Sequence, residues 1–278
     1  LLYSDAKISG GSALDWVEAT VSELKSNSNV TLLPRSTVTG YYDHNFLVIN
    51  ERRTHHLGPG QADPRVSRER LWRVRASQVV LATGAIERPL VFSGNDVPGV
   101  MLCSAVSIYI RRYAVVPGRR GVVFTNNDSG YQAAVDMAWA GMEVSGVVDP
   151  RLSPRGQAVE TVEALGIPVY GGHVVCGTRT NAKGLNRIEL ARLTDDGSDI
   201  LSHKGLLDCQ VLAISGGWSP TVHLHSQSGA KARFDQDLAC FVPGNSVQAE
   251  RSAGSSAGTF DLAGCLGAGA SAGAAAAR

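Results

Sequence analysis

Two segments of the chain repeat one pattern, and few folds accommodate it. Gln78–Pro89 reads QVVLATGAIERP, and Gln210–Pro220 reads QVLAISGGWSP. Each begins with glutamine, continues with an apolar run, and reaches a glycine six positions after the glutamine. An unbroken run such as VVLA is typical of a strand covered on both faces, as in a parallel sheet. The copies lie too far apart for a solenoid repeat. They predict two domains, each of which ends its sheet with the same strand and turn.

Strands and helices alternate along most of the chain, which is the pattern of βαβ units. Residues 120–150 read as strand, turn, helix and strand, with Met137 in the buried face of the helix and Gly141 at its end. The predicted fold is α/β, with two nested dinucleotide-binding domains that are Rossmann-like and disulfide-reductase-like and have mostly parallel sheets. Residues 1–100 and 222–278 form the first domain, and residues 101–221 form an inserted second domain.

Three further segments complete this outline. An amphipathic helix is predicted from Ser12, as N-cap, to Leu24. Extended structure follows, and the polar stretch Thr54–Arg70, which is rich in glycine and proline, is predicted to be a loop. We expect that the chain is a fragment of a longer protein, because it does not start at methionine and stops within an alanine-rich helical pattern.

Composition excludes several classes of protein. Of the 278 residues, 44% are hydrophobic and 18% charged, which is ordinary for a globular protein. The net charge of +1 argues against nucleic acid or an anionic membrane as main partner. No apolar run is long enough to span a bilayer. The five cysteines form no C-x-x-C pair, which favours reduced thiols in a cytoplasmic protein.

The turn that should bind a phosphate in the second domain departs from the required pattern. A dinucleotide-binding unit needs G-x-G-x-x-G between strand and helix. Thr125 and Asn127 replace its first two glycines, and only Gly130 is kept. Asp128 places a negative charge where a phosphate would lie. Asp149 ends the next strand, either as a ribose-binding carboxylate or as a simple turn residue. We therefore expect a degenerate nucleotide site.

Other candidate residues favour structural roles. His223 and His225 are predicted to share one strand face but have no third metal ligand, so no metal site is expected. His55–His56 and Asp195–Asp196 are predicted to lie in solvated loops or turns. The pairs Arg111–Arg112 and Arg119–Arg120 indicate either a solvated face or a contact with a subunit or a flavin phosphate. No catalytic residue is predicted.

Several strings point to a known family. ATGAIERPLVFSGNDVPGVM, VTGYYDHN, FTNNDSGYQAA and FVPGNSVQAERSAGSSAGTFDLAGCLGAGASAG together cover most of the chain. They resemble the α subunit of heterotetrameric sarcosine oxidase. The alternatives are a subunit of an opine or cyanide-forming amino-acid dehydrogenase, and a pyridine-nucleotide-disulfide-reductase-like oxidoreductase, against which the missing C-x-x-C counts.

The resemblance implies a role in a larger enzyme. Such a complex oxidises sarcosine to glycine, reduces oxygen to peroxide and passes a one-carbon unit to tetrahydrofolate. Its β subunit carries FAD, FMN lies at the subunit contact, and the α subunit binds NAD without ordinary hydride transfer. The partners would be the β, γ and δ subunits. A glycine loop would precede Leu1, and a folate-binding domain would follow Arg278.

The resemblance also assigns site residues. Ala82, Thr83 and Gly84 match a turn that lies over the dinucleotide, and Thr37 and Val38 match a strand whose backbone contacts adenine. Gly264 matches the glycine of a late Gly-Asp pair, with Cys265 in place of the aspartate that holds the flavin ribityl chain. That replacement favours NAD over FAD. Without the first glycine loop, the isolated chain is expected to bind dinucleotide weakly or not at all and to be inactive.

Overall fold

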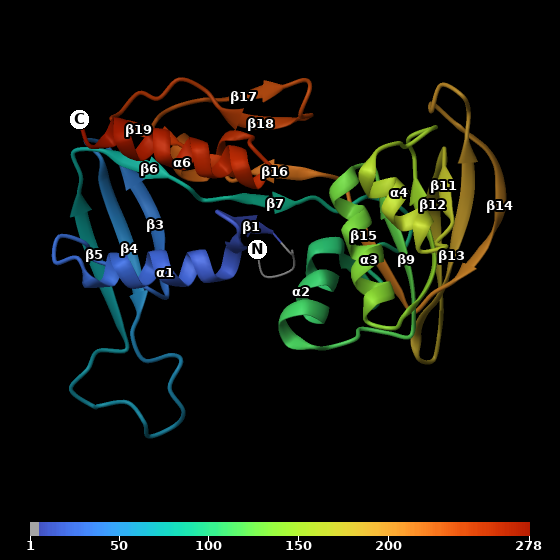
Figure 1. Ribbon diagram of the computed structural model, residues 1–278, viewed down its shortest axis with the longest axis horizontal. Helices are drawn as coiled ribbons and strands as arrows, with labels where there is room; N and C mark the ends of the chain where they lie inside the picture. The colour runs from blue at the N-terminus through green and yellow to red at the C-terminus, as the bar shows by residue number, and fades with distance from the viewer. Residues whose placement is uncertain (1–5) are drawn as a thin grey trace. The chain divides into compact units, whose positions relative to one another are not determined.

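The computed structural model describes residues 6–278, and it divides into two compact units (Figure 1). Unit 1 comprises residues 1–16 and 87–217, and unit 2 comprises residues 17–86 and 218–278. The division assigns residues 87–100 to the same unit as the predicted inserted domain, because β8 (Val100–Leu102) pairs with β15 (Val211–Ser215). The nesting of two dinucleotide-binding domains itself stays a prediction.

Unit 1 is built on a five-stranded sheet in which all strands are parallel. The strand order is β11-β10-β9-β15-β8. Residues of β9 such as Val122 and Val123 are fully buried, as expected for a strand with covered faces. The predicted α/β fold with a parallel sheet is therefore confirmed. The remaining strands of the sheet are β9 (Arg120–Thr125), β10 (Glu143–Asp149) and β11 (Val169–Gly171).

Helices cover one face of this sheet and an antiparallel sheet covers the other. One buried cluster joins Val123 to Val106 of α2 and Met137 of α3. A second cluster joins Val122 to Ile188 of the antiparallel sheet. The helices are α2 (Cys103–Tyr113), α3 (Tyr131–Trp139), preceded by the 3-10 turn η1 (Asp128–Gly130), and α4 (Gln157–Ala164), and the antiparallel strands are β12 (His173–Asn181), β13 (Gly184–Leu193) and β14 (Ile200–Asp208).

Unit 2 contains an antiparallel sheet of β3, β4 and β5, and a parallel pair of β6 and β19. Tyr41 and Leu47 of the antiparallel sheet pack against Val79 and Leu81 of β6. Val80 between them is 38% exposed, so β6 is buried on one face only. The run VVLA had predicted burial on both faces, and for β6 that prediction is wrong. The strands are β3 (Ser36–Tyr42), β4 (Phe46–Arg52), β5 (Glu69–Arg75), β6 (Val79–Leu81), β7 (Ala85–Glu87), β16 (Trp218–Pro220), β17 (Ala232–Asp235), β18 (Cys240–Pro243) and β19 (Glu250–Ser252), and the helices are α5 (His223–Gln227), η2 (Gly254–Ala257) and α6 (Leu262–Ala276).

The predicted N-terminal helix is present as α1 (Ala13–Ser26), after the short strands β1 (Lys7–Ile8) and β2 (Gly11–Ser12). The Ser12 hydroxyl oxygen accepts from the backbone N–H of Leu14 at 3.2 Å, which is the predicted capping contact. No helix in residues 6–278 has the length and apolar character needed to cross a membrane.

Candidate dinucleotide site

The candidate site of unit 2 lies where β6 and β19 end. The two strands are parallel, and Ser252 is paired with Leu81. Because parallel strands place their carboxyl ends at the same edge, the turn after β6 lies beside the turn after β19. The backbone N–H of Ala253 donates to the carbonyl of Leu81 at 2.9 Å and fixes this alignment.

Small residues form a cavity of about 220 Å³ at this edge. Gly84 and Gly254 have φ angles of +78° and +69°, a left-handed backbone that favours glycine. No charged side chain lines the cavity, so a flat ligand could approach the backbone directly. The residues that line the cavity are Ala82, Gly84, Ala253, Gly254, Ser255, Cys265 and Gly269.

The Thr83 side chain holds the first turn in place. Its hydroxyl donates to the carbonyl of Thr221 at 3.0 Å, and the N–H of Thr221 donates to the carbonyl of Gly84 at 2.9 Å. The structure thus brings two of the predicted residues, Ala82 and Gly84, to the cavity and gives Thr83 a bracing role.

The other predicted cofactor residues lie elsewhere. Thr37 and Val38 belong to β3 in the antiparallel sheet and do not line the cavity. Gly264 lies in the first turn of α6, where its N–H donates to Asp261 at 2.7 Å. A Cβ at Gly264 would lie 2.6 Å from the Thr259 side chain, so local packing explains this glycine.

Gly254 and Ser255, which the sequence analysis did not single out, line the cavity near the end of β19. Gly254 follows β19 after one intervening residue, whereas Gly264 is the third residue of α6. The string ERSAGSS, with a β-type stretch followed by small residues, carried the signal that could have found them. Cys265 nevertheless contributes to the cavity wall from α6.

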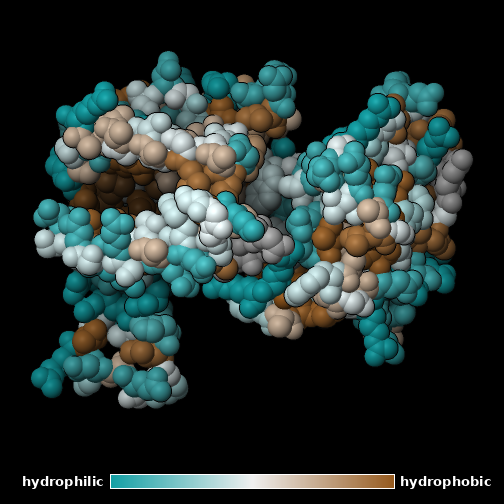
Figure 2. Space-filling model, in the orientation of Figure 1, coloured by the Kyte–Doolittle hydropathy of each residue, from teal (hydrophilic) through white to brown (hydrophobic). Residues whose placement is uncertain are grey.

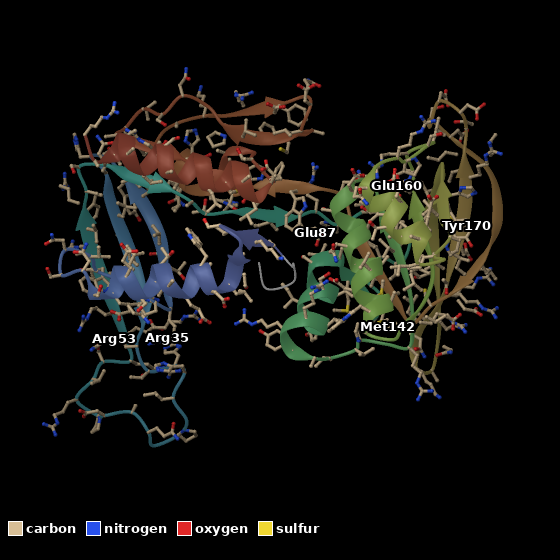
Figure 3. The ribbon with its side chains drawn as sticks, viewed as in Figure 1. Arg35, Arg53, Glu87, Met142, Glu160 and Tyr170 are labelled. Atoms are coloured by element: carbon tan, nitrogen blue, oxygen red, sulfur yellow. The ribbon has the colours of Figure 1, made fainter. Side chains whose placement is uncertain are left out.

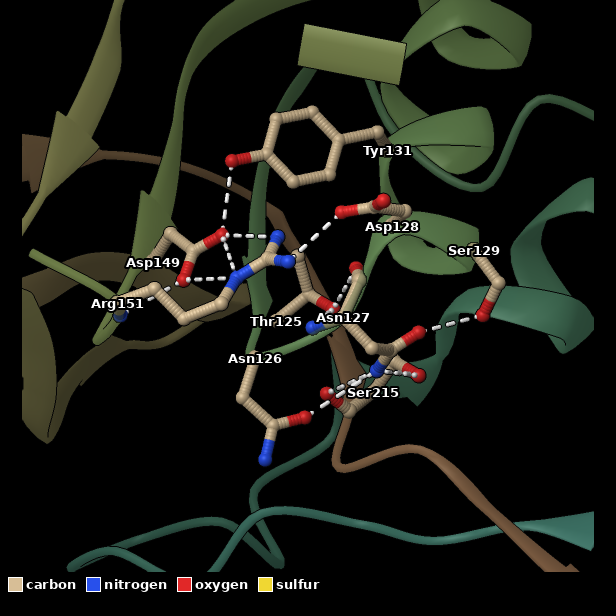
Figure 4. Close-up of polar contacts among 9 residues, drawn as sticks. All are labelled: Thr125, Asn126, Asn127, Asp128, Ser129, Tyr131, Asp149, Arg151 and Ser215. Carbon is tan, nitrogen blue, oxygen red and sulfur yellow. Dashed lines mark hydrogen bonds and ion pairs between the residues drawn. The ribbon is translucent and has the colours of Figure 1, made fainter. Parts of the chain in front are cut away.

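The corresponding edge of unit 1 is filled by its own polar side chains (Figure 4). Thr125 ends β9 and is paired with Ser215, which ends β15. The Asn127 side-chain amide donates to the Ser215 hydroxyl at 3.1 Å, and the Asn126 N–H donates to the Ser215 carbonyl at 3.3 Å. The Asn127 N–H donates to the Thr125 hydroxyl at 3.2 Å. Amides that could face a phosphate are therefore already bonded.

Gly130 is the one glycine kept from the pattern, and packing explains it. A Cβ there would lie 2.3 Å from the Thr125 hydroxyl oxygen. The close approach of the helix start to strand β9 requires glycine, which is the packing role of the third glycine in the motif.

Asp149 ends β10 and is fully buried. The Arg151 guanidinium donates to it through Nε at 3.1 Å and Nη2 at 2.7 Å, and through Nη1 to Asp128 at 2.7 Å. The Tyr131 hydroxyl also donates to Asp149, at 2.8 Å. Burial and this hydrogen bond raise the pKa of Tyr131, and the hydrogen bond to Asp149 raises the pKa of Arg151. A carboxylate with these partners has no free position for a ribose hydroxyl.

The remaining candidates have structural partners. Arg111 pairs with the buried Asp136 at 2.8 Å, and Arg120 pairs with Glu143 at 2.8 Å. Two arginines of the predicted basic patch are thus engaged within unit 1. Burial raises the pKa of the Cys209 thiol to about 12, which makes it a poor nucleophile.

The two histidines lie on the short helix α5 and not on a strand, which corrects the prediction of a shared strand face. The chain turns into a helix after Pro220 ends β16. His225 is buried and its Nδ1 lies 2.8 Å from Glu250, while its Nε2 accepts from the Gly244 N–H at 3.1 Å. Among the side chains that the structure describes, no group of three metal-ligating residues comes together.

Comparison with known proteins identifies relatives of this architecture. The chain is 45% identical to the sarcosine oxidase α subunit of Corynebacterium sp. strain P-1 over 273 residues, which are 98% of this chain and 28% of that subunit. Identity to the α subunit of Rhizobium meliloti strain 1021 is 39% over 277 residues, 97% of this chain and 26% of that subunit. No protein-family model matches.

A solved structure confirms the fold. L-proline dehydrogenase from P. horikoshii superposes with a TM-score of 0.62 at 19% identity, covering 92% of this chain and 43% of that one. The chain spans about a quarter of the length of the curated relatives it matches. Over that span, the chain is similar to the α subunits of sarcosine oxidase.

Proposed function

We propose that this chain is the dinucleotide-binding region of the α subunit of an amine-oxidising enzyme of the sarcosine oxidase type. The observation that carries the proposal is the cavity of small residues at the carboxyl ends of β6 and β19. Ligands of α/β proteins bind at this edge of the sheet. The fit is chemical as well as positional, because glycine and alanine allow a flat ring or a pyrophosphate to contact the backbone.

The cavity provides half of a dinucleotide site. Ligand pockets usually enclose roughly 300–1,000 Å³, whereas this cavity is about 220 Å³. A second element must therefore complete it. We propose that a glycine-rich phosphate loop elsewhere in the full-length subunit supplies it, and that the isolated chain binds dinucleotide weakly or not at all.

We propose NAD and not FAD as the ligand. By the resemblance, Cys265 replaces the aspartate that holds the flavin ribityl chain, and no carboxylate lines the cavity. The chain would contribute a scaffold and a nucleotide site. Amine oxidation, with FAD on a β subunit and FMN at a subunit contact, would take place outside it, as would transfer to tetrahydrofolate.

The sheet edge of unit 1 supports the proposal that the chain has one nucleotide site, in unit 2. Thr125, Asn127 and Ser215 satisfy one another at the sheet edge, and Arg151 saturates Asp149. We propose that this crevice binds no nucleotide and has a packing role.

Leucine in place of Gly269 tests the site in unit 2. Gly269 lines the cavity from α6, and a Cβ there has open space, so leucine would project into the cavity without backbone strain. Gly267→Leu is the matched control, because Gly267 lies on the same helix, has open space and does not line the cavity. The full-length subunit is purified, denatured, and its released nucleotide identified by chromatography.

We expect one NAD per wild-type and Gly267→Leu subunit and a loss of at least about tenfold in Gly269→Leu, with both variants folded. FAD in place of NAD would refute the choice of cofactor. Equal retention by both variants would refute the site. Micromolar affinity of the isolated chain for NAD would refute the half-site argument.

A further inference from the structure

A positively charged hairpin extends from unit 2. Residues 51–75, here called the basic hairpin, contain seven arginines and three acidic residues, although the whole chain carries a net charge of only +1. The segment comprises the last two residues of β4, the loop 53–68 and all of β5. Figure 1 shows the loop extending well beyond the ends of its strands, and Figure 2 shows its surface as mostly hydrophilic.

The loop is held in shape by its own polar contacts. The Arg53 N–H donates to the Arg68 carbonyl at 3.0 Å, and the Arg53 guanidinium donates to the Ser67 hydroxyl at 3.0 Å. His55 Nε2 accepts from Arg68 at 3.2 Å and lies 3.0 Å from Glu69. Loops longer than about 12–15 residues are uncommon in compact domains and are usually functional. An ordered loop of this length, which covers no core cluster, therefore indicates a partner.

A face of the antiparallel sheet continues the surface of the hairpin. Register places Arg75, Phe46 and Tyr42 side by side across the three strands. Arg73 lies two residues before Arg75 on β5 and therefore on the same face of the sheet. Tyr42 is 54% exposed, and Arg75 stacks over the Phe46 ring at 5.7 Å. Arginine with exposed aromatic side chains is the composition of protein–protein interfaces.

The base of the loop adds to the charge. The Arg52 N–H donates to the Arg35 carbonyl at 3.1 Å, which brings the end of β4 next to the residue before β3. Figure 3 shows the side chains of Arg35 and Arg53 near the point where the loop leaves the sheet. Arg52 and Arg73 are exposed and form no ion pair within residues 6–278, so their charges are available to a partner.

From these observations we infer that the basic hairpin and the Arg73–Arg75 face form the docking surface for an acidic face of another subunit. This inference rests on the proposed function, since it takes the chain to be part of a multi-subunit enzyme. A separate polypeptide is favoured because concentrated charge accelerates diffusional encounter, which a covalently linked domain does not need. A nucleic acid is disfavoured, because acidic side chains such as Glu51 and Glu69 are interspersed among the arginines.

Charge reversal tests the docking surface. The full-length α subunit carries Arg73→Glu with Arg75→Glu, and the matched control carries Arg155→Glu with Lys183→Glu, two exposed residues of unit 1. Association with the co-expressed partner subunits is measured by surface-immobilised binding at low and high salt. Circular dichroism and NAD content establish that each variant is folded and loaded.

We expect the hairpin variant to associate at least about tenfold more slowly at low salt and to lose most of its salt dependence, because rim charges act mainly on the association rate. The control should stay within about twofold of wild type. Equal effects of both variants, or no effect of either, would overturn the proposal. So would specific binding of a single-stranded oligonucleotide by the hairpin with unchanged subunit association. Absence of NAD from the wild-type subunit, together with the expected slowing of association in the hairpin variant, would instead count against the proposed function alone.

Discussion

Methionine in place of Arg151 would leave the carboxylate of Asp149 buried without its cation. Asp149 is fully buried, and three of its hydrogen-bonding contacts come from the Arg151 guanidinium. After the substitution, Asp149 would keep the Tyr131 hydroxyl at 2.8 Å and the backbone N–H of residue 151 at 2.8 Å. Methionine preserves the length and apolar part of the side chain, so the loss is mainly electrostatic.

The expected loss in the free energy of unfolding depends on how deeply the side chains of Asp149 and Arg151 are buried. Removing one partner of a buried pair typically costs about 3–5 kcal/mol, since a charge remains uncompensated. The Arg151 side chain is 35% exposed, and water therefore screens part of the interaction. We expect about 3 kcal/mol, which corresponds to a fall in Tm of roughly 6–12 °C for a unit of this size.

A double-mutant cycle separates this cost from general damage. Asp149→Asn combined with Arg151→Met removes the buried charge together with its partner, and it should recover at least about 1.5 kcal/mol relative to Arg151→Met alone. Arg155→Met is the control, because Arg155 is exposed and should change the free energy of unfolding by less than about 0.5 kcal/mol. Urea denaturation followed by circular dichroism measures wild type, Asp149→Asn, Arg151→Met, the double variant and the control. A single variant that costs under about 1 kcal/mol, or a double variant no more stable than the single, would refute the reasoning.

Three further substitutions probe other parts of the chain. Hydrogen bonds from the Thr194 hydroxyl, and then from the N–H and hydroxyl of Ser198, lower the pKa of Asp196 to about 2. The ionised carboxylate therefore contributes stability above the ordinary pKa of 3.8, and this contribution is lost as pH falls toward 2. In urea titrations between pH 6 and 2, Asp196→Asn should lose less stability with acid than wild type. Burial, and then the charge of Glu250, raise the pKa of Tyr41 to about 12. The protonated phenol therefore contributes its full stability below pH 10, and this contribution is lost between pH 10 and about 12. Tyr41→Phe should remove that alkaline loss in the same assay. Met137 is fully buried in the core. Met137→Ala should lower the free energy of unfolding by about 2–5 kcal/mol in urea denaturation. A loss under about 1 kcal/mol would contradict this.

Local sequence signals predicted the elements of unit 1 well. The helix that contains Met137 ends at Trp139, and the φ of +79° at Gly141, two residues later, explains why glycine was a reliable stop signal. The strand that follows Gln210, β15, is fully buried, as its unbroken apolar run predicted. Such signals depend on neighbours in the chain, and for this reason they can be read without the fold.

The interaction that dominates the end of β10 could not be predicted in the same way. Asp149 in the sequence was compatible with a ribose ligand and with a turn, and Arg151 two residues later gave no indication of its direction. What decides is the Tyr131 hydroxyl, which reaches Asp149 from α3, together with Asp128 at the start of that helix. These contacts depend on how closely the helix packs on the sheet, which in turn depends on Gly130.

The place of the late glycine depends on the fold in a similar way. Gly254 and Gly264 both stand among small residues, so composition does not distinguish them. Only the pairing of Ser252 with Leu81 shows which glycine reaches the edge where Ala82 lies. Strand register joins residues that are far apart in the sequence, and a shift by one residue would turn a different set of side chains to that edge. The Gly269→Leu variant therefore tests the cavity that this register creates, because Ala82, Gly254 and Gly269 line it together.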